Sequence, residues 1–210
     1  MDQLLHEINE DLNKDKLRSF FKKYKFILFF IIAIILLSVT TFVSRKIYLE
    51  QQSKKSLQSF LNINYLIDQK NFQNAKDELW KLTNSSINIY KNLAFSKLLE
   101  LESNNPDTQK KIFEKIESSN LNRDDKTLFQ IKRAILFFDN LDEKELLRIL
   151  DIQKFKNSPW ETLALDVIGD FYQSKNQNQK AKEFYNKIIN LKNLPDIFKQ
   201  DIQRKINRLG

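Results

Sequence analysis

Apolar residues return every three or four positions along most of the chain, which is the spacing of one face of an α-helix. From residue 57 onward this pattern predicts a series of amphipathic helices. The apolar positions that define the first six are Leu57, Phe60, Leu61 and Ile67; Ala75, Leu79 and Leu82; Leu93, Ala94, Leu98 and Leu101; Ile112, Phe113 and Ile116; Leu128, Ile131, Ile135 and Phe138; and Leu146, Ile149 and Leu150. Two glycines and three prolines leave few turn signals for a many-stranded sheet, so the predicted fold class is all-α.

Helix boundary signals divide the chain in the same places. The stretch "NNPD" at Asn104 to Asp107 separates two helices. "SPWE" at Ser158 to Glu161 offers a capping serine, a proline at the first helical position and a glutamate three residues on. "DEKE" at residues 142–145 repeats the capping-box spacing, so another helix is expected to begin there.

The predicted helices fall into pairs whose first members begin near residues 54, 87, 123 and 159. These intervals of roughly 33 to 36 residues match the period of helical repeats of the tetratricopeptide kind. We therefore expect an α-solenoid of tetratricopeptide-like hairpins within residues 45–210. The final segment is amphipathic through Ile197, Phe198, Ile202 and Ile206 and is expected to cap the last pair.

A single glycine before the C-terminal residue lies inside a helical pattern, where it costs about 1 kcal/mol relative to alanine. In tetratricopeptide repeats, a small residue in the first helix lets the second helix approach closely. An aromatic residue three positions later fills the interior, and an alanine in the second helix meets the contact. The residues at these offsets are Gly169, Tyr172, Ala181 and Tyr185, which we interpret as repeat-packing residues.

A degenerate copy of this motif occurs in "NINYLIDQKNFQNAKDELWKL". Ala75 takes the place of Ala181, Leu79 takes the place of the second tyrosine, and Ile63 replaces the glycine. The middle pairs keep the hydrophobic period without the small residues, so a looser helical solenoid remains possible there. An ordinary helical hairpin remains the alternative for the glycine motif.

Residues 26–44, "FILFFIIAIILLSVTTFVS", contain no charged residue, and a helix of this length covers about 28 Å, close to the hydrocarbon thickness of a bilayer. Lysine or arginine flanks the run at both ends, so we predict one transmembrane helix. A cleaved signal peptide is the rival interpretation, but its apolar region is usually shorter and ends in a small-residue cleavage site. Residues 1–25 are predicted to form an amphipathic cytoplasmic tail with Leu4, Leu5, Ile8 and Leu12 on one stripe.

Basic residues are more numerous before the span than just after it. Six precede it, namely Lys14, Lys16, Arg18, Lys22, Lys23 and Lys25, and four follow it, namely Arg45, Lys46, Lys54 and Lys55. The positive-inside rule therefore predicts a cytoplasmic N-terminus and places the repeat domain on the extracytoplasmic side, which in a bacterium is the periplasm.

Residues suited to reaction chemistry are scarce. The chain has no cysteine, and its one histidine, His6, lies in the tail without partners. It also lacks a glycine-rich phosphate loop and a histidine-based metal spacing. We therefore expect no enzyme activity, no metal, no cofactor and no small-molecule substrate. The net charge of +8 comes from lysines interleaved with acidic residues, without an arginine-rich block, so nucleic-acid binding is not expected either.

The order of tail, span and helical repeats resembles the bacterial family of ancillary Sec translocon subunits, including its alphaproteobacterial relatives. The tail "EINEDLNKDKLRSFFKKYKFIL" and the repeat residues Gly169, Asp170, Ala181 and Tyr185 carry the likeness. The chain departs from the family in having "SKNQNQ" where the repeat turn commonly has glycine, and in lacking small residues in its span. The resemblance implies a single-pass inner-membrane protein whose periplasmic domain associates with translocon components, periplasmic chaperones or exported proteins.

Stacked hairpins offer a surface for protein binding, so the predicted function is a membrane-anchored interaction module, either an ancillary translocon subunit or a chaperone-like adaptor. Asp166, Asp170 and Gln173 are predicted to face the partner from the first helix of the last pair. A structural scaffold in a cell-envelope or cell-division assembly remains the alternative. Trp80 and Trp160 are expected to be partly buried packing residues.

Overall fold

The computed structural model describes the backbone of residues 2–192 and 194–210, and the side chains of these residues except 2–21 and 28. The described part is helical and contains no strand. Its helices are α1 (Asp2–Asp68), α2 (Phe72–Leu82), α3 (Asn88–Leu101), α4 (Pro106–Ser118), α5 (Arg123–Leu136), the 3₁₀ helix η1 (Phe138–Asn140), α6 (Glu143–Ile149), α7 (Ile152–Phe155), α8 (Glu161–Ser174), α9 (Asn178–Ile189) and α10 (Asp196–Arg208).

The chain divides into two units, Met1–Lys55 and Ser56–Gly210. Helix α1 contains the predicted tail, the predicted span and the start of the repeat region. The side chains of the predicted amphipathic stripe and of His6 lie outside the described residues.

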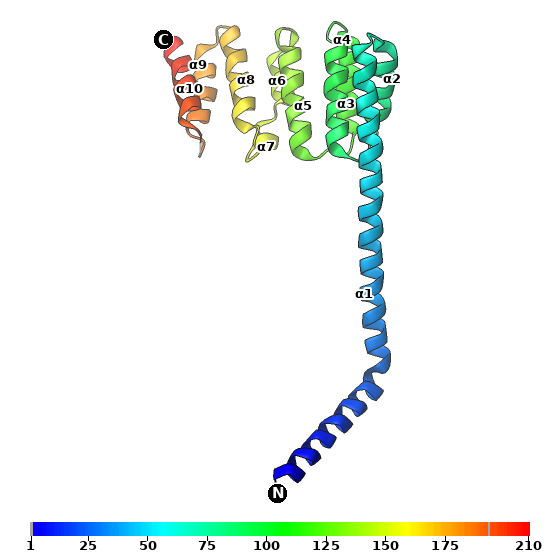
Figure 1. Cartoon of the computed structure of the whole chain (residues 1–210). Coiled ribbons are helices and arrows are strands. Elements are labelled where there is room, and N and C mark those ends of the chain that lie inside the picture. Colours follow the sequence, from blue (N-terminus) through cyan, green and yellow to red (C-terminus); the bar gives the residue numbers. More distant parts are fainter. Residues whose placement is uncertain (1, 193) are drawn as a thin grey trace. The chain divides into compact units, whose positions relative to one another are not determined.

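Four helical pairs form the second unit (Figure 1). They are the end of α1 with α2, α3 with α4, α5 with α6, and α8 with α9, followed by α10. The first helices of the last three pairs begin at Asn88, Arg123 and Glu161, within two residues of the predicted starts. The predicted all-α solenoid of hairpins is therefore confirmed.

Asparagine and aspartate side chains cap the starts of the middle helices. Asn105, Asn122, Asp142 and Asp151 each accept a hydrogen bond of 2.7–3.1 Å from a backbone N–H in the first turn that follows. These bonds satisfy N–H groups that have no partner inside the helix. Pro106 lies at the first position of α4, where its missing N–H costs nothing.

Helix α8 begins two residues later than its predicted capping motif. Glu161 is its first residue, so the prediction that Pro159 occupies the first helical position is wrong. The reason is a turn closed by the Glu161 N–H and the Ser158 carbonyl, 3.2 Å apart. Ser158 Oγ accepts from the Trp160 N–H and the Glu161 carboxylate accepts from the Asn157 N–H, so the reciprocal bonds precede the helix.

The turns of the first and last pairs have the same hydrogen bonds in the same order. Lys70 and Asn176 occupy equivalent positions with left-handed φ values of 58° each. In each turn the N–H of this residue donates to the carbonyl three positions earlier, and the next N–H donates to the carbonyl five positions earlier. Asparagine tolerates this conformation better than most residues, which explains how "SKNQNQ" makes the repeat turn without glycine.

Two hydrophobic cores follow one another along the sequence. The first runs from Ile63 to Phe129 and the second from Ile131 to Leu209. Helix α5 contributes to both, and Phe137, just after it, packs against both. The four pairs are therefore joined through α5.

The third pair departs from the other three because its second helix is short. Helix α6 has 7 residues, whereas α2, α4 and α9 have 11, 13 and 12. The chain then forms α7, whose Phe155 is fully buried in the second core. Residues of α5 line a pocket between α4, α6 and α7.

Candidate protein-binding surface

Gly169 makes room for the ring of Tyr185. A Cβ atom on residue 169 would lie 2.4 Å from Tyr185 Cε1 and 2.8 Å from Cδ1, closer than real carbon atoms approach. Both residues are buried, as are Tyr172 and Ala181 of the same motif. The close contact that the sequence motif predicts between α8 and α9 is therefore present, and it is a contact between glycine and tyrosine.

The first pair fills the same place with different side chains. Ile63 replaces the glycine, Leu79 replaces the tyrosine, and both are fully buried together with Ala75. A larger side chain on the first helix is thus matched by a smaller one on the second.

The polar face of α8 is engaged within the domain. The Tyr185 hydroxyl donates to Asp170 Oδ1 at 2.6 Å and lies 3.0 Å from Gln173 Oε1. Lys205 of α10 places its Nζ 2.6 Å from Asp166 Oδ1 and 2.8 Å from Asp170 Oδ1. The structure therefore brings the three predicted partner-binding residues together, around a tyrosine and a lysine of the same chain.

The acid–base properties of this cluster follow from its partial burial. Burial raises the pKa of Asp166 against the opposing effect of its hydrogen bond with Lys205. Burial and the hydrogen bond to Asp170 raise the pKa of Tyr185 well above its usual range. Burial alone would lower the pKa of Lys205, but its hydrogen bonds to the two carboxylates outweigh burial and raise it. The ammonium form of Lys205 is therefore stabilised.

A second cluster joins the third pair to the fourth. Glu143 of α6 accepts hydrogen bonds from the Tyr172 hydroxyl at 3.0 Å and from Lys180 Nζ at 2.9 Å. These bonds lower the pKa of Glu143. Burial, followed by the bond to Glu143, raises the pKa of Tyr172 to about 12.

The positions equivalent to Asp166, Asp170 and Gln173 can be found on the other first helices. Helices α3, α5 and α8 have 14 residues each, and when they are aligned from their first residues every buried position of α3 and of α5 is also buried in α8. The equivalent positions, which we call the first-helix row, are Leu93, Lys97 and Glu100 on α3 and Leu128, Lys132 and Ile135 on α5.

The first-helix row is open on α3 and α5. Ile135 is 52% exposed and Leu93 is 37% exposed. Leu136, next to Ile135, and Ile89, four positions before Leu93, are exposed as well. The sequence pattern placed Leu93 and Ile135 in the hydrophobic stripes, and this is wrong. On α5 Ile131 is buried as predicted, the other buried residues are Thr127, Phe129 and Ala134, and Phe138 belongs to η1.

Lys132 connects the row across the two helices. Its Nζ donates to Ser96 Oγ of α3 at 3.1 Å and lies 5.2 Å from the centre of the Phe129 ring. Burial lowers the pKa of Lys132. Phe129 in turn packs edge-on against Phe95, with ring centres 6.0 Å apart, so α3 and α5 also contact each other in the core beneath Lys132.

A family model described as a tetratricopeptide repeat-like domain matches residues 18–210. The chain belongs to this tetratricopeptide repeat-like family. Such domains are typically protein-interaction modules without catalytic function. Comparison with curated proteins and with solved structures gave no match.

The tetratricopeptide-like surface combines apolar and cationic side chains. Exposed leucine and isoleucine side chains on α3 and α5 gain free energy when a partner covers them, by about 25 cal/mol per Å² of apolar area. Sequence reasoning missed this row, because an exposed apolar residue at helical spacing looks the same as a core residue. The signal that could have found the row is the alignment of the first helices. It places Leu93 and Ile135 at positions where α8 has the polar residues Asp166 and Gln173.

The remaining sequence candidates have packing positions in the tetratricopeptide-like domain. Trp80 and Trp160 are both partly buried, against the first and second cores respectively. Within the described residues, no group of histidine, aspartate and glutamate side chains is arranged to hold a metal ion.

One segment of α1 is long and apolar enough to cross a membrane, with a mean hydropathy of 3.0, and none of it is buried in the structure. The core helix of a soluble protein would be mostly buried. The hydroxyl groups of this α1 segment form hydrogen bonds within the helix. Ser38, Thr40 and Thr41 donate to backbone carbonyls four residues earlier, at 2.9, 3.0 and 2.7 Å. Such bonds remove the need for water, as a lipid environment requires.

Proposed function

We propose that this protein is a membrane-anchored interaction module that holds a tetratricopeptide-like surface on the periplasmic side of a bacterial inner membrane. Its role would be that of an ancillary subunit of the Sec translocon or a chaperone-like adaptor for exported proteins. The observation that carries the proposal is the first-helix row on α3 and α5, where Leu93 and Ile135 are exposed and Lys132 donates a hydrogen bond from α5 to α3.

In this proposal the apolar segment of α1 holds the interaction surface at the membrane. Residues 26–44 form the apolar part of α1, and the excess of basic residues before them favours a cytoplasmic N-terminus. A domain held at the membrane meets chains at a high effective concentration, so modest affinity is enough for function.

The row on α8 has a different part in this proposal. Asp166, Asp170 and Gln173 contact Tyr185 and Lys205 inside the domain. A partner that reaches them competes with Lys205 or binds next to it. We therefore propose α3 and α5 as the main contact area, with the three α8 residues at its margin.

Site-specific photocrosslinking tests this function. A photoreactive amino acid at position 135 of the full-length chain, in intact membranes, is expected to capture Sec components, periplasmic chaperones or exported proteins, identified by mass spectrometry. The matched control is position 186, because Asn186 is exposed on the second helix α9. Equal capture at both positions would contradict the proposed surface, and capture of division or wall-synthesis proteins would favour a scaffold.

The orientation is tested separately. A reporter enzyme that is active only in the periplasm, fused after Gly210, is expected to be active. Activity of the matching cytoplasmic reporter alone would overturn the periplasmic assignment without touching the binding surface.

A further inference from the structure

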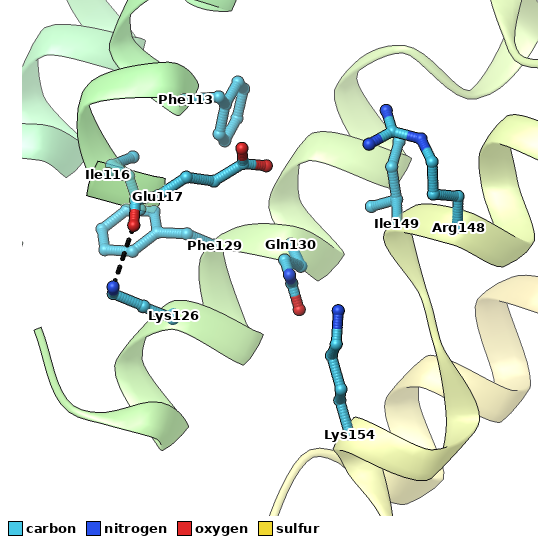
Figure 2. A pocket seen from close by; sticks show the side chains of 9 residues that line it. All are labelled: Phe113, Ile116, Glu117, Lys126, Phe129, Gln130, Arg148, Ile149 and Lys154. Atoms are coloured by element: carbon cyan, nitrogen blue, oxygen red, sulfur yellow. Dashed lines mark hydrogen bonds between the residues drawn. The ribbon is translucent and has the colours of Figure 1, made fainter. Parts of the chain in front are cut away.

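A pocket of about 300 Å³ lies between the second helices α4 and α6 and is also lined by residues of α5 and α7 (Figure 2). It is lined by other residues than the first-helix row. Its apolar wall comes from both cores, with Phe113, Ile116 and Phe129 from the first and Ile149 from the second. The pocket therefore lies at the boundary between the two cores, beside the short helix α6.

Three cationic side chains from three helices line this pocket: Lys126 of α5, Arg148 of α6 and Lys154 of α7. Lys126 donates to the backbone carbonyl of Glu117 at 2.9 Å and has no ion pair among the described side chains. Arg148 pairs with Glu145 only at 3.9 Å, and Lys154 pairs with Asp151 only at 3.8 Å. These separations are at the outer limit of an ion pair, so both charges are weakly compensated.

The single acidic residue of the pocket does not compensate them. Glu117 Oε1 lies 3.0 Å from the guanidinium of Arg133, which is outside the pocket lining. The local balance around the opening is therefore positive, and this favours an anionic group.

The backbone of Lys154, at one side of the pocket, is fixed by a hydrogen bond from another helix. The guanidinium of Arg123, at the start of α5, donates to the Lys154 carbonyl, with Nε at 3.2 Å. The next residue, Phe155, is fully buried. Helix α7 is thus held by the hydrogen bond at Lys154 and by the burial of Phe155. Figure 2 shows Lys154 and Gln130 directed into the same opening.

We propose that this pocket binds a carboxylate side chain from an acidic segment of a protein partner. This inference rests on the proposed interaction function and adds a second contact site with a stated chemistry. The ammonium and guanidinium groups would pair with the carboxylate. Gln130 would donate its amide N–H to the carboxylate. Its Oε1 has no hydrogen-bond partner among the described residues, so no bond to that oxygen has to break when the amide turns. The pocket volume of about 300 Å³ is at the lower end of the range of ligand sites and has room for one side chain.

The test uses the full-length protein in phosphatidylcholine nanodiscs. The probe is a fluorescein-labelled peptide of glutamate and serine residues, and its control has glutamine in place of each glutamate. Wild type is expected to bind the glutamate peptide roughly five-fold more tightly, since each exposed ion pair contributes about 0.2–1 kcal/mol. The preference should weaken as salt is added.

Matched variants locate the effect. The double substitution Arg148→Gln and Lys154→Gln is expected to abolish the preference. The control Lys115→Gln with Lys144→Gln removes the same charge from exposed positions on α4 and α6 outside the pocket, and is expected to keep it. Equal loss in both variants, or displacement of the peptide by inorganic phosphate well before acetate, would overturn the proposal. If crosslinking at position 135 succeeds while the peptide shows no preference, the pocket inference fails and the proposed function stands.

Discussion

The first and last hairpins of the domain make the same turn and the same close helix contact with different residues. In the last hairpin, Gly169 on the first helix receives the ring of Tyr185. In the first hairpin, Ile63 and Leu79 fill that place, and both are fully buried. The contact therefore constrains the combined size of the two side chains, because close-packed interiors leave no room for two large residues and no stable void for two small ones.

The two hairpins differ in a second way, through polarity. The tyrosine brings a hydroxyl that bonds to Asp170, and Asp170 is also paired with Lys205 of α10. The hydrocarbon pair of the first hairpin makes no such connection. The tyrosine of the close contact thus links the last hairpin to the carboxylate that pairs with α10. In the first hairpin the ion pair to the next element is separate from the close contact and joins Lys76 of α2 to Glu102 at the end of α3, 2.8 Å apart.

The largest expected effect comes from overfilling the last hairpin. Gly169→Leu should lower the free energy of unfolding by about 3 kcal/mol or more, because its Cβ alone would lie 2.4 Å from Tyr185 Cε1. Urea unfolding of the full-length protein in a mild detergent, followed by far-ultraviolet circular dichroism, measures this loss.

The rescue of this variant tests the comparison directly. Gly169→Ile combined with Tyr185→Leu copies the first hairpin and should recover most of the stability. A double variant as unstable as Gly169→Ile alone would show that the two hairpins do not follow the same packing rule.

An intermediate effect is expected from removing the charge at the end of the domain. Lys205→Met should cost about 2 kcal/mol at neutral pH, because it leaves two partly buried carboxylates without their cation. Since the folded state raises the pKa of Lys205, the stabilisation is fully present below the ordinary value of 10.5 and is lost as pH rises through the folded-state pKa.

The measurement is therefore the difference in unfolding free energy between wild type and Lys205→Met at neutral and at alkaline pH. This difference should shrink above pH 10.5. Lys199→Met, at an exposed position of the same helix, is the control and should change stability little. A difference independent of pH would contradict the ionic role.

The smallest effect concerns the two equivalent turns. Lys70→Gly should raise the free energy of unfolding by up to about 1 kcal/mol, because a lysine with φ of 58° is strained. Asn176→Gly should change it by only a few tenths, since asparagine adopts this conformation more easily. Thermal melting of both variants side by side measures the contrast, and an equal gain in both would contradict the assignment of strain to Lys70.

The sequence predicted best those features that depend on residues close to one another along the chain. Helix periodicity located the four pairs, and the offsets around Gly169 located the close contact, because both depend on neighbours within one hairpin. The turn at "SKNQNQ" was harder to interpret, since the left-handed residue there is asparagine instead of glycine.

The interaction surface was less predictable because it depends on distant residues. Lys205 pairs with Asp166 across 39 positions of sequence. The amphipathic pattern predicts that the final segment caps the last pair, but no local pattern indicates which charged residues it pairs with. Leu93 and Ile135 keep helical spacing and are exposed all the same, since spacing identifies a stripe without saying whether another element covers it. The pocket between α4 and α6 lies beside a second helix of only 7 residues. The apolar pattern alone did not reveal how short this helix is.

Helix α5 ends the first core with Phe129 and begins the second with Ile131. Each core is therefore made from one uninterrupted stretch of chain, in the order in which a ribosome produces it. The earlier half can pack as soon as α5 has emerged, before α8 to α10 exist. Hydrogen exchange on nascent chains stalled after α5 would then find protected amides in α2 and α3, so that the domain matures from its N-terminal half toward its C-terminus during synthesis.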